Sequence, residues 1–178
     1  VDALRLIQES QIEAKEENAT IQYLAEAFMN SVELMQTMLG VEDFELFYKD
    51  YNADVDRAVA KRMFQIYREN NTALPSIYEK IDKEFGGDSD KYVDWLYDNS
   101  QLTSLEKYNK IKSLPKKKQK RAFKKDPLYE LTSSIIDLYR KYAPAVWAAD
   151  AKFAEGHRLY IDGLMKMQPE KAWASDAN

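Results

Sequence analysis

The stretch PLYELTSSIIDLYRKYAPAVWAADAKFAEGHRLYIDGLMKMQ, residues 127–168, decides the fold class. Its apolar residues recur at spacings of three, four and seven, which places them on one face of a helix. They are Leu128, Leu131, Ile135, Leu138, Tyr142, Val146, Phe153, Tyr160, Leu164 and Met167. Pro127 suits a first helical turn, where a missing N–H costs nothing, whereas Pro144 removes an interior hydrogen bond. We therefore expect one long helix, kinked at Pro144.

The same spacing extends through most of the remaining chain. Between Asn18 and Leu39 the apolar residues lie on one helical face, which predicts a single helix there. Further helices are expected over residues 2–16, 41–48, 54–70, 75–85, 88–97, 103–113 and 115–125. Asp54 and Asp88 are expected to cap their helices, and Thr103 with Glu106 matches a capping box.

The composition supports an all-α protein. The chain has 178 residues, only 5 Gly and 5 Pro, which are too few for the frequent turns of a β-sandwich or barrel. With 12 Tyr, 7 Phe and 3 Trp it is too aromatic to be disordered. No apolar run approaches the roughly 20 residues that span a bilayer. We expect one multi-helix, bundle-like domain over residues 1–178, with an irregular tail at 169–178.

Residues that could carry catalysis or bind metal are scarce. The absence of Cys excludes a disulfide scaffold, a thiolate zinc site and a cysteine nucleophile. The single His, His157, lies between Gly156 and Arg158 in a predicted helix, which is typical of an ordinary surface residue. Gly87-Asp88-Ser89 lacks the following glycines that would aim amides at an oxyanion. The sequence therefore predicts no catalytic residue, no metal site and no cofactor.

One strong charge cluster lies at residues 116–125, in a chain whose net charge is −4. Its cations are Lys116, Lys117, Lys118, Lys120, Arg121, Lys124 and Lys125. Such a run is typical either of a phosphate-contacting patch or of a solvated helix. Only Phe123 is aromatic in this segment, so base stacking is not indicated. We favour the solvated helix and expect no nucleic-acid partner.

Four ordered stretches together carry a family resemblance. They are FYKDYNADVDR at 47–57, FGGDSDKYVDWLYDNS at 85–100, KDPL at 125–128, and RLYIDGLMKMQPEK at 158–171 followed by DAN at 176–178. In this order and spacing they resemble the bacterial dipeptidyl-peptidase 7/11 family of serine exopeptidases.

The resemblance implies a helical domain inserted in a chymotrypsin-like double β-barrel. On this interpretation the chain is a non-catalytic cap over the active-site cleft, and its tail at 169–178 leads toward the second barrel. The partners implied are the barrel domain and a peptide that loses dipeptides from its N-terminus. The resemblance also implies the periplasm or surface of a Gram-negative bacterium and leaves a homodimeric parent open. A start at Val1 fits a processed chain or a piece of a longer one.

The triad motifs of that family have no counterpart here, so no catalytic residue is carried over. Tyr51, Asn52, Asp56 and Arg57 match the family pattern and are the candidates for substrate contact. For Asp56 and Arg57 the alternative is helix capping and local ion pairing, worth about 0–1 kcal/mol if exposed. Two rival functions remain: a stand-alone helical interaction module, or a nucleic-acid-binding protein that uses residues 116–125.

Overall fold

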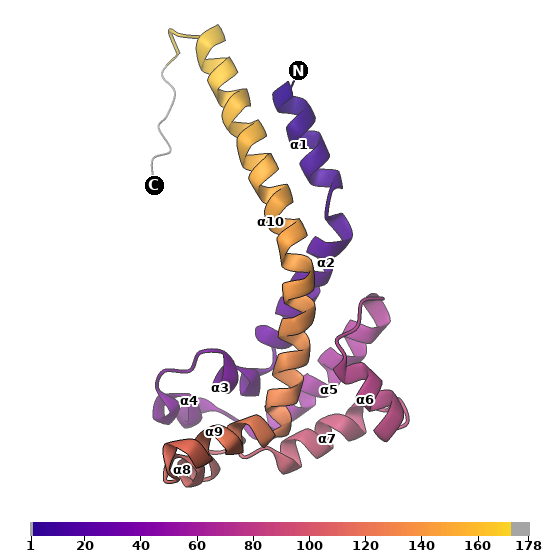
Figure 1. Ribbon diagram of the computed structural model, residues 1–178, viewed down its shortest axis with the longest axis vertical. Coiled ribbons are helices and arrows are strands. Elements are labelled where there is room, and N and C mark those ends of the chain that lie inside the picture. Colours follow the sequence, from indigo (N-terminus) through magenta and orange to yellow (C-terminus); the bar gives the residue numbers. More distant parts are fainter. Residues whose placement is uncertain (1, 172–178) are drawn as a thin grey trace. The chain divides into compact units, whose positions relative to one another are not determined.

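Helices form the whole framework of the computed structural model, which describes residues 2–171 (Figure 1). Within that range no strand is present, and the prediction of an all-α protein is confirmed. Two compact units can be distinguished. One comprises the residues up to Ala19 together with those from Tyr142 onward, and the other comprises Thr20–Lys141.

The α-helices are α1 (Asp2–Ile12), α2 (Lys15–Leu24), α3 (Gln36–Leu39), α4 (Phe44–Asp50), α5 (Ala53–Asn70), α6 (Ile77–Glu84), α7 (Ser89–Asn99), α8 (Leu105–Lys112), α9 (Lys116–Lys125) and α10 (Pro127–Met167). The predicted long C-terminal helix is confirmed as α10, which stays helical through Pro144. The kink at that residue stays a prediction. Of the expected tail, residues 172–178 lie outside the described residues. No helix described between residues 2 and 171 has the length and apolar character needed to cross a bilayer.

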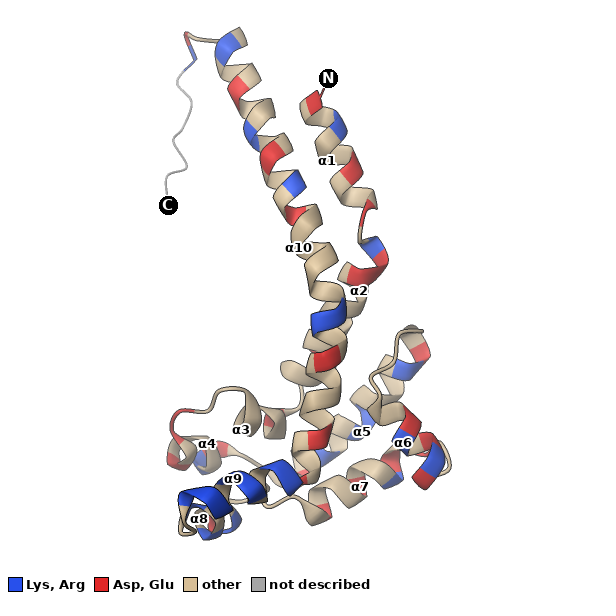
Figure 2. Ribbon diagram, in the orientation of Figure 1, with Lys and Arg blue, Asp and Glu red and all other residues tan. Residues whose placement is uncertain are grey.

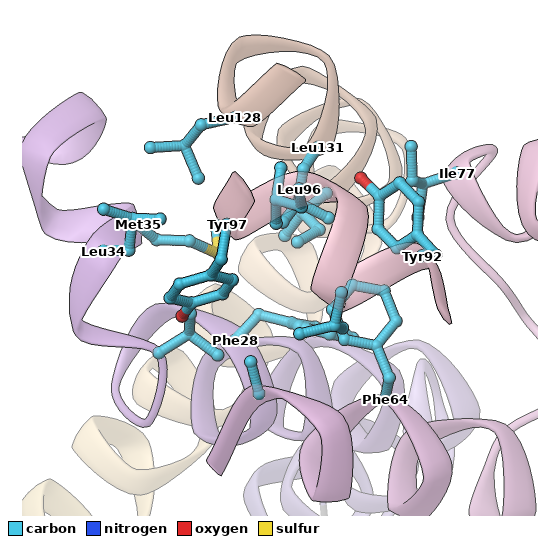
Figure 3. Packing of buried hydrophobic residues seen from close by; sticks show 14 of the residues in the cluster. Phe28, Leu34, Met35, Phe64, Ile77, Tyr92, Leu96, Tyr97, Leu128 and Leu131 are labelled. Atoms are coloured by element: carbon cyan, nitrogen blue, oxygen red, sulfur yellow. The ribbon is translucent and has the colours of Figure 1, made fainter. Parts of the chain in front are cut away.

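The core of the unit Thr20–Lys141 is rich in aromatic side chains. In α5, Phe64 lies with its ring centroid 5.0 Å from Phe28 and 5.6 Å from Tyr92 of α7. Figure 3 shows side chains from α5, α7 and the first turns of α10 converging on this region. The fully buried large side chains are Tyr67, Tyr78, Tyr92, Tyr97, Phe28, Phe64, Leu24, Leu34, Met35, Ile77, Ile81 and Leu96. Burial of this apolar surface is the main force that holds these helices together.

The expected single helix from Asn18 to Leu39 is wrong. After α2 the backbone forms a π-helical turn (Ala25–Met29), becomes extended at Val32 (φ −95°, ψ 99°), and resumes as a 3₁₀ turn (Glu33–Met35). The predicted apolar face is still buried at Leu24, Phe28, Val32 and Met35. A continuous helix would bond the amides of residues 33 and 34 to carbonyls of the preceding turn. Here both amides donate hydrogen bonds to the Asp56 carboxylate instead.

Two predicted helix caps are shifted by a residue or two. Asn52, not Asp54, caps α5, and Ser104 caps α8 by accepting from the Lys107 amide at 3.3 Å. The Thr103 hydroxyl instead donates to the Ser100 carbonyl at 3.3 Å. The cap predicted at Asp88 is confirmed, since its carboxylate accepts from two amides of the first turn of α7. Side chains that bond the backbone locally compete for these positions, so sequence alone places a cap only to within a few residues.

In the other unit, α1 packs closely against the later part of α10. Lys152 of α10 lies 2.6 Å from a carboxylate oxygen of Glu13 and 3.7 Å from one of Glu9. Gly156 is buried, and a Cβ placed there would lie 3.0 Å from both the Ala3 carbonyl oxygen and the Ile7 amide nitrogen. Because these are backbone atoms, they can move away only if α1 as a whole shifts.

Replacing Gly156 with alanine is therefore expected to loosen α1. The steric cost of about 1–3 kcal/mol exceeds or cancels the roughly 1 kcal/mol that alanine gains in helix propensity. Hydrogen exchange of the α1 amides should accelerate. Gly163→Ala is the matched control on the same helix, because nothing lies within 4 Å of its Cβ position. That variant should gain about 1 kcal/mol in stability. Equal stabilisation by both substitutions would contradict the close approach.

Candidate functional site

Asp56, in the first turn of α5, is the most heavily hydrogen-bonded of the four predicted site residues. It is 3% exposed. Its Oδ1 accepts from the Glu33 amide at 2.7 Å, and its Oδ2 accepts from the Leu34 amide at 2.9 Å. Oδ2 also accepts from the hydroxyls of Tyr97 at 2.6 Å and Tyr51 at 3.1 Å. Four donors offset the cost of removing a carboxylate from water. Asp56 therefore joins α5, α7 and the 3₁₀ turn.

The two phenols at this carboxylate are held in their neutral form. Burial, and then the negative charge of Asp56, raises the pKa of Tyr51 and of Tyr97 well above the ordinary tyrosine value. Both hydroxyls remain protonated donors at neutral pH. Neither can serve as a general base there, so their contribution is to hold Asp56 in place.

Arg57 also reaches toward α7. Its guanidinium lies 2.7 Å from Asp98 and 3.4 Å from Asp94, and its carbon lies 5.5 Å from the centre of the Tyr97 ring. Lys61 adds a second cation to Asp94 at 2.8 Å. Arg57 is thus ion-paired, but its partners Asp94 and Asp98 stand 37 and 41 residues away on α7, so the pairing is not local. For Asp56 the alternative interpretation, a cap of its own helix, is wrong. Its carboxylate is buried and joins distant segments instead.

Tyr51 and Asn52 line an open pocket of about 450 Å³. The Asn52 side-chain oxygen accepts from the amides of Asp54 and Val55, each at 3.1 Å, which holds the residue at the pocket rim. The other lining residues are Glu45, Tyr48, Lys49, Ala53, Thr103, Ser104 and Leu105. This pocket offers an aromatic wall, one carboxylate and one ammonium group. Such a set can hold a small polar or zwitterionic group.

The structure therefore separates the four candidates into two groups. Tyr51 and Asn52 line the pocket, whereas Asp56 is buried and outside its lining, and Arg57 pairs with carboxylates of α7. Their role in binding substrate stays a prediction. The sequence analysis did not predict the hydrogen bonds that Asp56 accepts from distant residues. A signal was present, because Asp56 continues the buried stripe of Ala60, Phe64 and Tyr67 on α5, where a charged residue requires partners.

Two other predicted features do not line this pocket. His157 is exposed on α10, where its ring stacks on Phe153 with centroids 6.0 Å apart. Within residues 2–171, no group of three or more His, Asp and Glu side chains is arranged to hold a metal ion. The basic segment 116–125 forms α9, the almost wholly blue helix in Figure 2.

Comparison with known proteins identifies relatives over most of the chain. Residues 41–178 match the family described as Peptidase S46. The dipeptidyl-peptidase 7 of Porphyromonas gingivalis is 38% identical over 135 residues, which cover 74% of this chain and 19% of that protein. The dipeptidyl-peptidase 7 of Phocaeicola vulgatus is 32% identical over 155 residues, which cover 86% and 20%. The chain thus spans about a fifth of the length of these relatives.

A solved structure has the same fold. The crystal structure of Porphyromonas endodontalis DPP11 in complex with the dipeptide Arg-Glu matches with a TM-score of 0.75 and 24% sequence identity. The matched region covers 93% of this chain and 27% of that one. At this identity the likeness establishes the fold alone.

Proposed function

Because the chain belongs to the peptidase S46 family, we propose that it is the helical cap of a serine-type dipeptidyl peptidase that releases dipeptides from peptide N-termini. The match to relatives named dipeptidyl-peptidase 7 carries this proposal. On this view residues 1–178 form one helical part of the enzyme, and the segment 169–178 leads toward its second barrel. The nucleophile and its base then belong to parts of the enzyme outside this chain.

A cap contributes to catalysis by shaping access to the reacting groups. It excludes water from the cleft and limits the cleft to a chain end. A free peptide N-terminus carries an ammonium group, which a carboxylate can recognise by a charge-assisted hydrogen bond. Glu45, in the pocket beside Tyr51 and Asn52, offers such a group. We assign Tyr51 and Asn52 to substrate contact, with Asp56 and Arg57 positioning the helices beneath them.

The setting proposed for the whole enzyme is the periplasm or surface of a Gram-negative bacterium. The named relatives are bacterial proteins, which supports a bacterial origin. Its partners would be the peptide substrate and the catalytic barrels. A homodimeric enzyme stays a prediction.

The proposal is tested first with the chain alone. Residues 1–178 should fold, with strong helical circular dichroism, and release no fluorophore from dipeptidyl-coumarin substrates. The full-length protein encoded by the gene should release it, and a serine-directed inhibitor should abolish that activity. Hydrolysis by the chain alone that the same inhibitor blocks would overturn the assignment of a non-catalytic cap.

The restriction to chain ends needs a second measurement in the full-length enzyme. With residues 20–141 replaced by a short linker, hydrolysis of N-terminally acylated peptides should rise relative to free ones, because the cap no longer excludes them. The unmodified enzyme is the control and should discriminate strongly in favour of free N-termini. Unchanged discrimination in the deletion variant would contradict the capping role.

A further inference from the structure

The helix α9 presents an unusual concentration of positive charge. Seven of its ten residues are Lys or Arg, and all seven are exposed: Lys116, Lys117, Lys118, Lys120, Arg121, Lys124 and Lys125. In Figure 2 the neighbouring α8 also carries residues drawn in blue. No ion pair in the described part of the chain involves any of the seven. We call these residues the α9 cationic face.

The cations occupy one continuous side of the helix. At 100° per residue they span an arc of about 200°, from Lys116 to Lys118. The remaining arc holds Gln119, Ala122 and Phe123, which are partly buried. The Phe123 ring lies 6.4 Å from that of Tyr108 in α8, so this side packs on the protein. The helix therefore packs on the protein through its less polar side, and its exposed side chains are the seven Lys and Arg residues.

This arrangement is unfavourable for the helix itself. Lys116, Lys117 and Lys118 occupy the first turn, which contains no acidic residue, although the N-terminal end of a helix favours negative charge. Like charges also stand four residues apart, as at Lys116 and Lys120, or Lys120 and Lys124, and such pairs are destabilising. A helix needed only for solubility is better served by mixed charges. Departures of this kind from local consistency are expected at functional sites.

We propose that the α9 cationic face binds an anionic lipid surface through phosphate headgroups. Six of the seven cations are Lys, which act as point charges toward phosphates rather than as the planar donors that read base edges. The face carries no aromatic side chain on which a nucleic-acid base could stack. A broad surface of phosphates fits the outward-facing arc.

The mode of binding follows from the same residues. No large apolar side chain of α9 is exposed, so the helix lies on the headgroups without inserting. Binding is then electrostatic, reversible and weakened by salt. Without these seven charges the net charge of the chain falls from −4 to −11, so the rest of the protein is repelled by the same surface.

The test is sedimentation of the chain with phosphatidylglycerol-rich vesicles, compared with pure phosphatidylcholine vesicles. The unmodified chain should bind the first and not the second, and roughly 0.5 M salt should release it. The triple variant Lys117→Glu, Lys120→Glu and Lys124→Glu should bind at least about a hundredfold more weakly. The control variant Lys15→Glu, Lys83→Glu and Arg158→Glu makes the same change in net charge at exposed positions elsewhere and should retain most of the binding.

Stability provides a second readout, which tests the repulsion between like charges separately from lipid binding. Lys120→Glu alone should raise the melting temperature by about 1–3 °C, because it pairs with Lys116 and Lys124, while it weakens vesicle binding. Equal binding to both vesicle types, or equal loss in the control variant, would overturn the proposal. So would tight binding of duplex DNA under salt conditions where the vesicles are not bound, since that identifies nucleic acid as the partner.

Discussion

Replacing Asp56 with alanine is expected to lower the free energy of unfolding of the chain by about 3–5 kcal/mol. The substitution removes the acceptor from two amides and two hydroxyls at once. The amides of Glu33 and Leu34 have no alternative carbonyl, because the turn at Val32 is extended. Urea denaturation followed by circular dichroism measures the effect. Asp56→Asn, which keeps one acceptor oxygen but turns an amide toward the donors, should lose part of this stability.

Asp54→Asn is the matched control for this prediction. Asp54 lies in the same first turn of α5 and is exposed, and its side chain accepts no hydrogen bond comparable to those of Asp56. Loss of its charge near the helix N-terminus should cost only about 0.3–1 kcal/mol. A similar loss for Asp54→Asn and Asp56→Asn would show that the buried network contributes little and that only charge near the helix end matters.

The second large effect is expected for Phe64→Ala, at about 3–5 kcal/mol. Phe64 is fully buried, and its ring contacts those of Phe28, Tyr78 and Tyr92 at centroid distances of 5.0–5.7 Å. Truncation removes buried apolar area and leaves a cavity that these rings cannot fill without leaving their rotamers. Thermal and urea unfolding should both shift, and the near-ultraviolet signal of the surrounding tyrosines should weaken.

Leu46→Ala supplies the control for core truncation. Leu46 lies on α4 and is 62% exposed, so its loss should change stability by no more than about 0.5 kcal/mol. A loss for Phe64→Ala close to that of Leu46→Ala would mean that the aromatic cluster is loosely packed. The two variants together separate the cost of a cavity from the general effect of removing a large side chain.

The family and the fold class were both predictable from the sequence. Helical spacing over residues 127–168 predicted α10, and the scarcity of Gly and Pro excluded most β folds. The resemblance carried by four ordered stretches is confirmed by the Peptidase S46 match over residues 41–178. These predictions succeed because they depend on local periodicity and on motif order, which do not require knowledge of which segments touch.

The candidate site was only partly predictable. The sequence points to the motif at residues 51–57, but it does not tell which of these residues line a pocket and which are structural. Tyr97 lies 41 residues from Asp56, so their hydrogen bond appears only once α5 and α7 are packed together. Packing of α5 on α7 therefore makes Asp56 a buried hydrogen-bond acceptor. Tyr51 and Asn52 line the pocket instead.

The amino-acid sequence by itself determined that this protein is helical, which faces of its helices are apolar, and that one segment concentrates positive charge. Tertiary structure alone decided where the helix predicted from Asn18 to Leu39 is interrupted. The reason is energetic: a buried carboxylate needs donors, and the amides of residues 33 and 34 satisfy it at the expense of local helical bonds. Competition of this kind between local and distant partners is resolved only when the chain is packed.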